Sequence, residues 1–229
     1  MFGSDTSMLI YNLSYAIVPL IFAITVHEVA HGWTAKQFGD LTAHQAGRLT
    51  LNPIKHIDPI GSLVVPIFLF LTSPFIFGWA KPVPVSVNRL RSPRRDMPLV
   101  ALAGPGVNLV MALLWALFAA AQFFVLSTAD LGSQWLLNMA GFGIQINVLL
   151  AVFNMLPIPP LDGGRVLRSL VPENFGQMLD RIEPFGIFIV IGLFILDSMQ
   201  VIQFFAVFIE PPMLFLTDFF YSVIQLGRA

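Results

Sequence analysis

Residues 8–33 read MLIYNLSYAIVPLIFAITVHEVAHGW, an apolar run that ends in a cluster of ionisable side chains. Its apolar part, residues 8–26, is about as long as the ~20 residues that a helix needs to cross ~30 Å of hydrocarbon. Three further runs reach or exceed that length, at residues 97–126, 135–156 and 185–209. Since none of them alternates apolar with polar residues, they predict membrane-spanning helices and not the strands of a barrel.

The composition also indicates a bilayer protein. Of the 229 residues, 56% are hydrophobic and 11% are charged, which is far more apolar than an ordinary soluble domain. A net charge of −1, without a basic run interleaved with aromatic residues, argues against nucleic-acid binding. Because cysteine is absent, any metal ion has to be held by His, Asp or Glu. We therefore predict an all-α integral membrane protein, a multi-span helical bundle with about 4–6 membrane segments.

Basic residues indicate how the chain is oriented in the membrane. They form two clusters between the first and second long runs, at Lys36, Arg48 and Lys55 and then at Lys81, Arg89, Arg91, Arg94 and Arg95. Both clusters are expected in the cytoplasm, yet an apolar run, residues 60–77, lies between them. We therefore predict a re-entrant segment at residues 60–87, which enters the membrane and returns to the same side. Counting crossings then places His27 and Asp162 at the same, cytoplasmic end.

The sequence HEVAH predicts a metal site. His27 and His31 are four residues apart on a helix, so both imidazoles project from one face and can share a metal ion. Glu28 lies beside them, where it can take a proton from water that the metal has acidified and later pass it to a leaving amine. This is the zincin arrangement. An accidental match is disfavoured because ionisable residues at the end of an apolar span are costly.

A catalytic zinc site needs a third protein ligand and an open position. The candidates are His44, His56, Asp58, Asp162, Glu173 and Glu183. Asp162 is favoured because the preceding prolines break the helix and the following glycines permit tight turning, so that its carboxylate can point back into the bundle. The alternative is an ordinary helix-capping Asp, which the presence of HEVAH at the same membrane side makes less attractive.

Three motifs carry a family resemblance. HEVAH, AGPGVN at residues 103–108 and NMLPIPPLDGGR at residues 154–165 resemble the core segments of the site-2 protease family of intramembrane zinc proteases. GRLTLNPIKHIDPIG and FGWAKPVPV resemble its short bacterial and archaeal branch. The resemblance covers about residues 21–170. It implies hydrolysis of peptide bonds in or near transmembrane helices of membrane-protein substrates, with one Zn²⁺ ion held by His27, His31 and Asp162, and with Glu28 as the general base.

The sequence shows no internal repeat, no low-complexity linker and no hydrophilic stretch long enough for a second folded domain. Residues 1–229 are expected to form a single membrane-embedded metalloprotease domain, with the catalytic core at about residues 8–170 and C-terminal membrane segments within residues 185–226. The number of crossings after residue 184 stays open, because residues 213–226 form a short run and Asp197 falls near the middle of the preceding one. The inner (cytoplasmic) cell membrane is the expected location. Oligomeric state, substrate identity and upstream regulation stay open.

Several other residues have two interpretations. Asn154 resembles a family position thought to hold the substrate backbone or the developing oxyanion, and it fits equally well as an interhelical hydrogen-bond partner. Asn108 is interpreted as a residue that allows close helix packing. His56 and Asp58 could orient a ligand imidazole, although solvated loop residues are the favoured interpretation. Residues 78–85 are a candidate edge strand that pairs with unwound substrate.

Two rival functions fit the sequence less well. A membrane zincin that cuts surface or soluble chains would take a downstream Glu as its third ligand, but we expect Glu173 and Glu183 in a short polar loop. A non-proteolytic metal-binding membrane protein would not need Glu28, and a transporter would need polar residues along several spans. Transmembrane protein substrates and the lipid bilayer are therefore the expected partners.

Overall fold

The computed structural model describes residues 2–65, 78–125 and 131–226, and this part of the chain is helical without any β-strand. Three long helices are α1 (Phe2–Gln37), α4 (Pro93–Val125) and α5 (Leu131–Asn154). A fourth is formed by η5 (Phe205–Ile209) and α9 (Glu210–Leu226), which continue one another. Within the described residues, these four are long and apolar enough to cross a membrane. The prediction of an all-α, multi-span membrane protein is confirmed, at the lower end of the expected number of segments.

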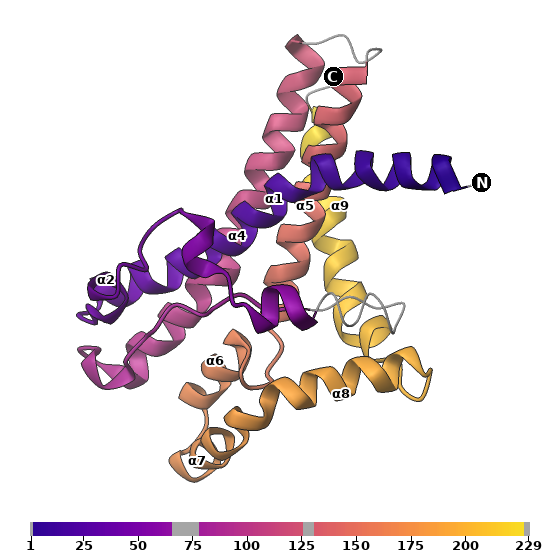
Figure 1. Ribbon diagram of the computed structural model, residues 1–229. Helices are drawn as coiled ribbons and strands as arrows, with labels where there is room; N and C mark the ends of the chain where they lie inside the picture. Colours follow the sequence, from indigo (N-terminus) through magenta and orange to yellow (C-terminus); the bar gives the residue numbers. More distant parts are fainter. Residues whose placement is uncertain (1, 66–77, 126–130, 227–229) are drawn as a thin grey trace.

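The long helices form a bundle whose two ends differ (Figure 1). The end of α4, the start of α5 and the end of α9 lie at one end, and the shorter helices α6 (Asp162–Leu170), α7 (Glu173–Ile182) and α8 (Gly186–Ser198) lie at the other. The remaining short elements are α2 (Thr42–Gln45), η1 (Pro53–His56), η2 (Ile60–Val64), η3 (Val87–Arg89) and η4 (Glu183–Phe185). Ala112 and Ala116 of α4 pack against Ile144 and Val148 of α5, and such small side chains let membrane helices approach closely.

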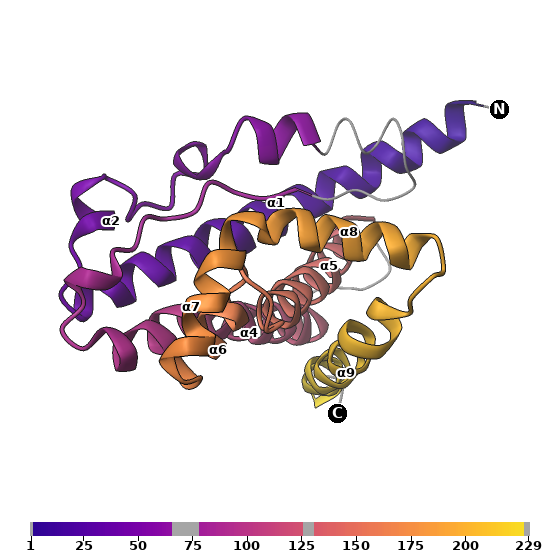
Figure 2. The same ribbon diagram turned by 90° about the horizontal axis from the view of Figure 1, so that it is seen from below.

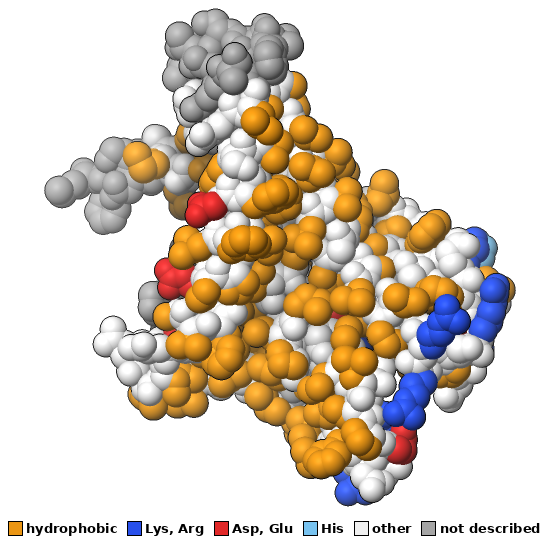
Figure 3. All heavy atoms as spheres, turned by 180° about the vertical axis from the view of Figure 1, so that it is seen from behind, with side chains coloured by type: hydrophobic (Ala, Val, Ile, Leu, Met, Phe, Trp, Pro, Cys, Tyr) orange, Lys and Arg blue, Asp and Glu red, His pale blue; other side chains and the backbone are white. Residues whose placement is uncertain are grey.

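The outer surface of the bundle is apolar. Between 11% and 39% of the most apolar window of each candidate span is buried inside the chain, so most apolar side chains face outward. Figure 3 shows hydrophobic side chains spread over one face of the bundle, with Lys and Arg gathered towards one end. Such a surface requires a lipid environment, and the chain is therefore a multi-pass membrane protein.

The C-terminal region differs from the expected continuous run at residues 185–209. Helix α8 ends at Ser198 after 13 residues, about 20 Å of helix, which is too short to span the hydrocarbon. The chain then turns at Gln200, whose φ is 58°, and the Asp197 carboxylate accepts a hydrogen bond from the Phe205 N–H at 3.1 Å. Residues 205–209 instead join α9. The described C-terminal region therefore holds one candidate span, whereas the sequence analysis allowed either one crossing or two.

The middle of the predicted re-entrant segment, residues 66–77, lies outside the described residues. Its two flanks lie side by side, because Trp79 N–H donates to Gly61 O at 3.0 Å and Lys81 N–H donates to His56 O at 2.9 Å. Re-entry into the membrane stays a prediction. Residues 78–86, here called the 78–86 segment, form no strand and run beside α1 (Figure 2).

Candidate metal centre

Three buried side chains bring one ligating atom each to a common point. His27 Nε2 and His31 Nε2 are 3.0 Å apart, and Asp162 Oδ2 lies 3.3 Å from the first and 3.2 Å from the second. The three residues are between 4% and 6% exposed. Asp162 Oδ2 is buried and accepts no hydrogen bond from the part of the chain that the structure describes. A buried carboxylate oxygen without a donor is costly, and a cation held between the three atoms would satisfy it.

The dimensions of this triangle fit zinc. Ligands at about 2.0–2.1 Å in tetrahedral geometry lie roughly 3.3 Å from one another, close to the observed separations of 3.0–3.3 Å. Three protein ligands would leave a fourth position open, which is the composition of catalytic rather than structural zinc sites.

His27 is oriented by a chain of buried amides. Its Nδ1–H donates to Asn108 Oδ1 at 2.5 Å, and Asn108 Nδ2 donates to Ala23 O at 3.2 Å and to Asn147 Oδ1 at 2.8 Å. Asn147 in turn donates to Gly143 O at 2.8 Å. Both Asn side chains are fully buried. Because Nδ1 carries the proton, Nε2 is free to bind a metal.

The interpretation of Asn108 as a packing residue missed this orienting contact. The available signal was an amide in the middle of an apolar span, where an unpaired polar group is costly and a specific partner is expected. Asn147, in the next span, carries the same signal. What the sequence does not indicate is which residue across the bundle each amide would meet.

His31 is oriented by a different contact. Its Nδ1–H donates to the Val100 carbonyl oxygen at 2.8 Å, so its Nε2 also faces the centre of the triangle. Gly104 of α4 lies directly against the two rings, because a Cβ at this position would overlap both His31 and His27. The backbone of α4 therefore forms one wall of the centre, and only glycine fits there.

Asp162 is positioned by the break between α5 and α6. Gly163 and Gly164 lie against the backbone of the preceding turn, and a Cβ at Gly163 would overlap the Met155 carbonyl oxygen. This close approach turns the first residue of α6 towards the histidine pair. The Asp162 carboxylate oxygen thereby lies within 3.3 Å of both imidazole Nε2 atoms, where the three groups can share a cation.

Glu28 lies next to His27 in sequence and is half-buried. Its Oε2 accepts a hydrogen bond from the Val83 backbone N–H at 2.7 Å. The 78–86 segment is itself held at two further points, by Arg48 donating to the Lys81 carbonyl at 2.7 Å and by Ser86 N–H donating to Asp40 at 2.6 Å. The Glu28 carboxylate is therefore held by the 78–86 segment, whose Val83 lies 55 residues further along the chain.

The other third-ligand candidates lie elsewhere. Glu173 and Glu183 begin the helices α7 and η4, so the expected polar loop is wrong. Glu173 pairs with Arg168 at 2.9 Å, and Glu183 lies 4.0 Å from Arg165. His44 is exposed. Within the described residues, His27, His31 and Asp162 form the one group of three or more metal-binding side chains.

Three further residues have structural contacts. His56 is buried and bonds through Nε2 to Thr50 O at 2.9 Å, so the interpretation of a solvated loop residue is wrong for it. Asp58 accepts from Gly61 N–H at 2.7 Å at the start of η2. The Asn154 amide donates to Leu150 O of its own helix at 2.9 Å.

Comparisons with known proteins agree with this chemistry. The model of peptidase family M50 matches residues 122–196. The chain is 38% identical over 191 residues to "Putative zinc metalloprotease YwhC" of Bacillus subtilis, covering 82% of this chain and 84% of that one. It is 31% identical over 180 residues to "Putative zinc metalloprotease Rip2" of Mycolicibacterium smegmatis, covering 79% and 66%. It is 21% identical over 159 residues to "Zinc metalloprotease MJ0392" of Methanocaldococcus jannaschii, covering 69% and 35%.

No solved structure matches the chain. The family model and the long, well-covered alignment with the Bacillus protein are nevertheless sufficient for assignment. They agree with the all-helical membrane bundle and with a buried site whose donor atoms suit zinc. The chain therefore belongs to peptidase family M50, the site-2 protease family of zinc metalloproteases.

Proposed function

We propose that this chain is an intramembrane zinc metalloendopeptidase, which hydrolyses peptide bonds in or near the transmembrane helices of membrane-protein substrates. The observation that carries the proposal is the buried triangle of His27, His31 and Asp162, in which the two histidines lie on the candidate membrane-spanning helix α1 together with Glu28. A site on such a helix is accessible to a substrate that arrives within the bilayer. We place this site in the cell's inner membrane, near the cytoplasmic face.

The proposed roles follow from the contacts. His27, His31 and Asp162 hold one zinc ion, which when bound supplies a Lewis acid that polarises a carbonyl oxygen and lowers the pKa of water. Glu28 is not among the three converging side chains, so it is available as the general base. It takes the proton from the attacking water and returns it to the leaving amine nitrogen. The Val83 N–H holds one Glu28 oxygen in place while the other oxygen remains for proton transfer.

A cavity of about 480 Å³ supports access to the centre. It is lined by Val83 and Val85 of the 78–86 segment, by Met97 of α4 and by Gly164 and Arg165 of α6. Gly164 and Arg165 follow the Asp162 ligand closely, so the cavity reaches the neighbourhood of the metal centre. We propose that water and the unwound substrate enter here.

The 78–86 segment is the proposed surface for an extended substrate. The backbone N–H groups of Trp79, Lys81 and Val83 are all occupied, and Pro82 and Pro84 have none. The segment therefore offers mainly carbonyl acceptors on its other edge, which suits pairing with the N–H groups of an unwound helix. The same prolines discourage unwanted pairing with other strands.

Asn154 is proposed, secondarily, to donate to the oxyanion or to the substrate backbone. Its amide now donates to Leu150 O, so this role requires the side chain to rotate away from its own helix. Replacing Asn154 with Ala would lower kcat without lowering zinc content if the role is correct.

The variant Glu28→Gln tests the main proposal. We expect proteolysis to fall by at least about 10²-fold, the usual contribution of a general base, while the zinc content of the purified chain stays near that of the wild type. His27→Ala is the matched control and should lose both zinc and activity. Comparison of membrane-protein fragments in cells with either variant identifies the substrates. Loss of zinc from Glu28→Gln would instead assign Glu28 to the coordination shell.

A further inference from the structure

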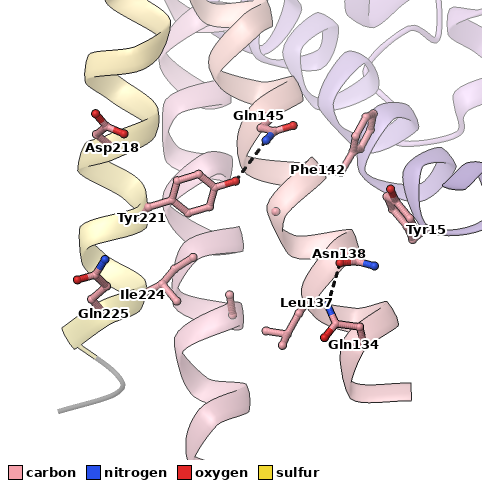
Figure 4. Close-up of a pocket in the computed structure, with 12 residues that line it drawn as sticks. Tyr15, Gln134, Leu137, Asn138, Phe142, Gln145, Asp218, Tyr221, Ile224 and Gln225 are labelled. Carbon is pink, nitrogen blue, oxygen red and sulfur yellow. Dashed lines mark hydrogen bonds between the residues drawn. The ribbon is translucent and has the colours of Figure 1, made fainter. Parts of the chain in front are cut away.

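A second cavity, of about 780 Å³, opens between α1, α5 and α9 (Figure 4). Helix α5 contributes Gln134, Asn138, Gly141 and Gln145, and α9 contributes Asp218 and Tyr221. Its lining shares no residue with the cavity beside the metal centre. We call it the outer groove, because it extends along α5 towards the end of the bundle opposite α6–α8.

The spacing of the lining residues matches a helix-packing surface. On α5 the residues at 134, 138, 141 and 145 follow one another at steps of four, three and four, which place them on one face. This face is about 16 Å long. A Cβ added at Gly141 would meet only Tyr221 Oη, at 3.7 Å, so the floor of the groove is open. Interfaces between membrane helices favour small residues and side-chain hydrogen bonds of this kind.

The outer groove carries polar groups that lipid tails cannot satisfy. Gln134, Gln145 and Asp218 are exposed although they lie within the candidate spans. Asp218 is eight residues before the end of its span at Leu226, about 12 Å into the helix. Gln145 donates to Tyr221 Oη at 3.3 Å, whereas Asp218 has no hydrogen bond or ion pair to the part of the chain that the structure describes. A carboxylate facing hydrocarbon is unfavourable and marks a functional position.

We propose that the outer groove binds the transmembrane helix of a membrane-protein substrate that carries a basic side chain at the depth of Asp218. The helical spacing of the lining residues favours a helix as the occupant, and the unpaired Asp218 carboxylate favours a basic side chain on that helix. This inference rests on the proposed protease function. The inner end of the groove, at Gln145, is two residues from Asn147, whose amide belongs to the hydrogen-bond chain that reaches His27. A helix held in the outer groove therefore extends to the depth of the metal centre.

The test measures binding without turnover. The full chain carrying Glu28→Gln is reconstituted in phosphatidylcholine vesicles and titrated with two fluorescent transmembrane peptides of Leu and Ala. One peptide carries a single Lys about 12 Å from one end of its apolar stretch, and the other carries Leu there. We expect energy transfer to report binding of the Lys peptide that is about three- to twentyfold tighter, the range of polar contacts between membrane helices.

Variants of the groove locate the contact. Asp218→Asn should remove the preference for the Lys peptide, and Gly141→Leu should weaken both peptides by filling the floor. Gly192→Leu is the matched glycine control, since a Cβ at Gly192 meets nothing within 4 Å. Ser222→Ala, on α9 outside the groove lining, is the second control. Both controls should bind like the parent chain.

Equal affinity for the two peptides, or an unchanged preference in Asp218→Asn, overturns the proposal. The proposal is also overturned if Asp218→Asn reduces self-association between chains and leaves peptide binding unchanged. The groove would then be an interface between copies of this chain. Cleavage by the chain with Glu28 intact is scored separately. If the Lys peptide binds more tightly but is not cleaved, the result contradicts the protease function and not the groove. If the peptides are cleaved but bind equally well, the result contradicts the groove and not the protease function.

Discussion

The two histidines of the candidate metal centre present Nε2 because each Nδ1–H is already bound. Asn108 accepts from His27, and the Val100 carbonyl accepts from His31. The two acceptors differ in kind, since one is a side chain that mutation can remove and the other is backbone. This difference makes His27 the histidine whose orientation can be tested directly.

Replacing Asn108 with Ala should lower zinc affinity by about 10- to 100-fold, the usual effect of removing a group that orients a metal ligand. The reason is that His27 loses the acceptor at 2.5 Å that fixes its ring and tautomer. Zinc titration of the purified chain measures the effect, and excess zinc should restore binding. Gly106→Ala on the same helix is the control, because a Cβ there meets nothing within 4 Å. Unchanged affinity in Asn108→Ala would show that the contact does not orient the ligand.

Asp162→Ala should lose both zinc and activity, whereas Glu173→Ala and Glu183→Ala should keep both. The Asp162 oxygen lies within 3.3 Å of both imidazole nitrogens, and removing one of three ligands leaves a two-ligand site. Metal analysis and cleavage assays on the three purified variants distinguish them. Retention of stoichiometric zinc by Asp162→Ala, together with loss in either Glu variant, would transfer the third-ligand role to a Glu.

At the scale of elements, the 78–86 segment depends on Asp40, which follows the end of α1 at Gln37. The Asp40 carboxylate is fully buried and accepts from Thr42 N–H, from the Thr42 hydroxyl and from Ser86 N–H. Burial alone would raise its pKa, but these hydrogen bonds hold the pKa below the ordinary value of 3.8. Because the folded pKa is below the unfolded one, Asp40 stabilises the segment fully at pH values above the unfolded pKa, and this stabilisation is lost as the pH falls below it.

Hydrogen exchange of the Ser86 amide, corrected for the intrinsic effect of pH, should therefore show falling protection below about pH 4. Asp40→Asn cannot titrate and should show lower protection throughout, without this pH dependence, because an amide replaces the second acceptor oxygen. Mass spectrometry of the chain in detergent measures both. A wild-type pH profile that persists in Asp40→Asn would assign the effect to another group.

At the scale of the whole molecule, the orientation in the membrane can be read from accessibility. Lys55 and Arg91 are exposed, and the backbone ties the Arg91 region to the residue that follows α1, since Arg91 N–H donates to Phe38 O at 3.0 Å. In a chain without native cysteine, Lys55→Cys and Arg91→Cys should both react with an impermeant thiol reagent from the cytoplasmic side. Gln134→Cys, near the start of α5, should react from the other side. If positions 55 and 91 reacted from opposite sides of the membrane, the predicted re-entrant segment would instead be a true crossing.

Much of this protein follows from local properties of its sequence. Length and apolarity predict the spans at α1, α4 and α5, because crossing hydrocarbon depends only on how many consecutive apolar residues a helix has. The four-residue step between His27 and His31 likewise places two imidazoles on one helix face whatever surrounds them. The polar interruption at Asp197 was visible too, but its consequence, a turn instead of a span, depends on the bond that Asp197 makes to Phe205.

Tertiary packing alone decided the partners of these residues. Asn108 lies 81 positions from His27, and Val83 lies 55 positions from Glu28, so no spacing rule connects them. Several amides and backbone N–H groups could have met these side chains, and the choice depends on how α1, α4 and α5 cross and on where residues 78–86 return. Sequence determines which groups are chemically able to bind a metal and move a proton. The fold determines which hydrogen bonds hold those groups in place, because buried polar groups take the partners that helix packing brings within reach.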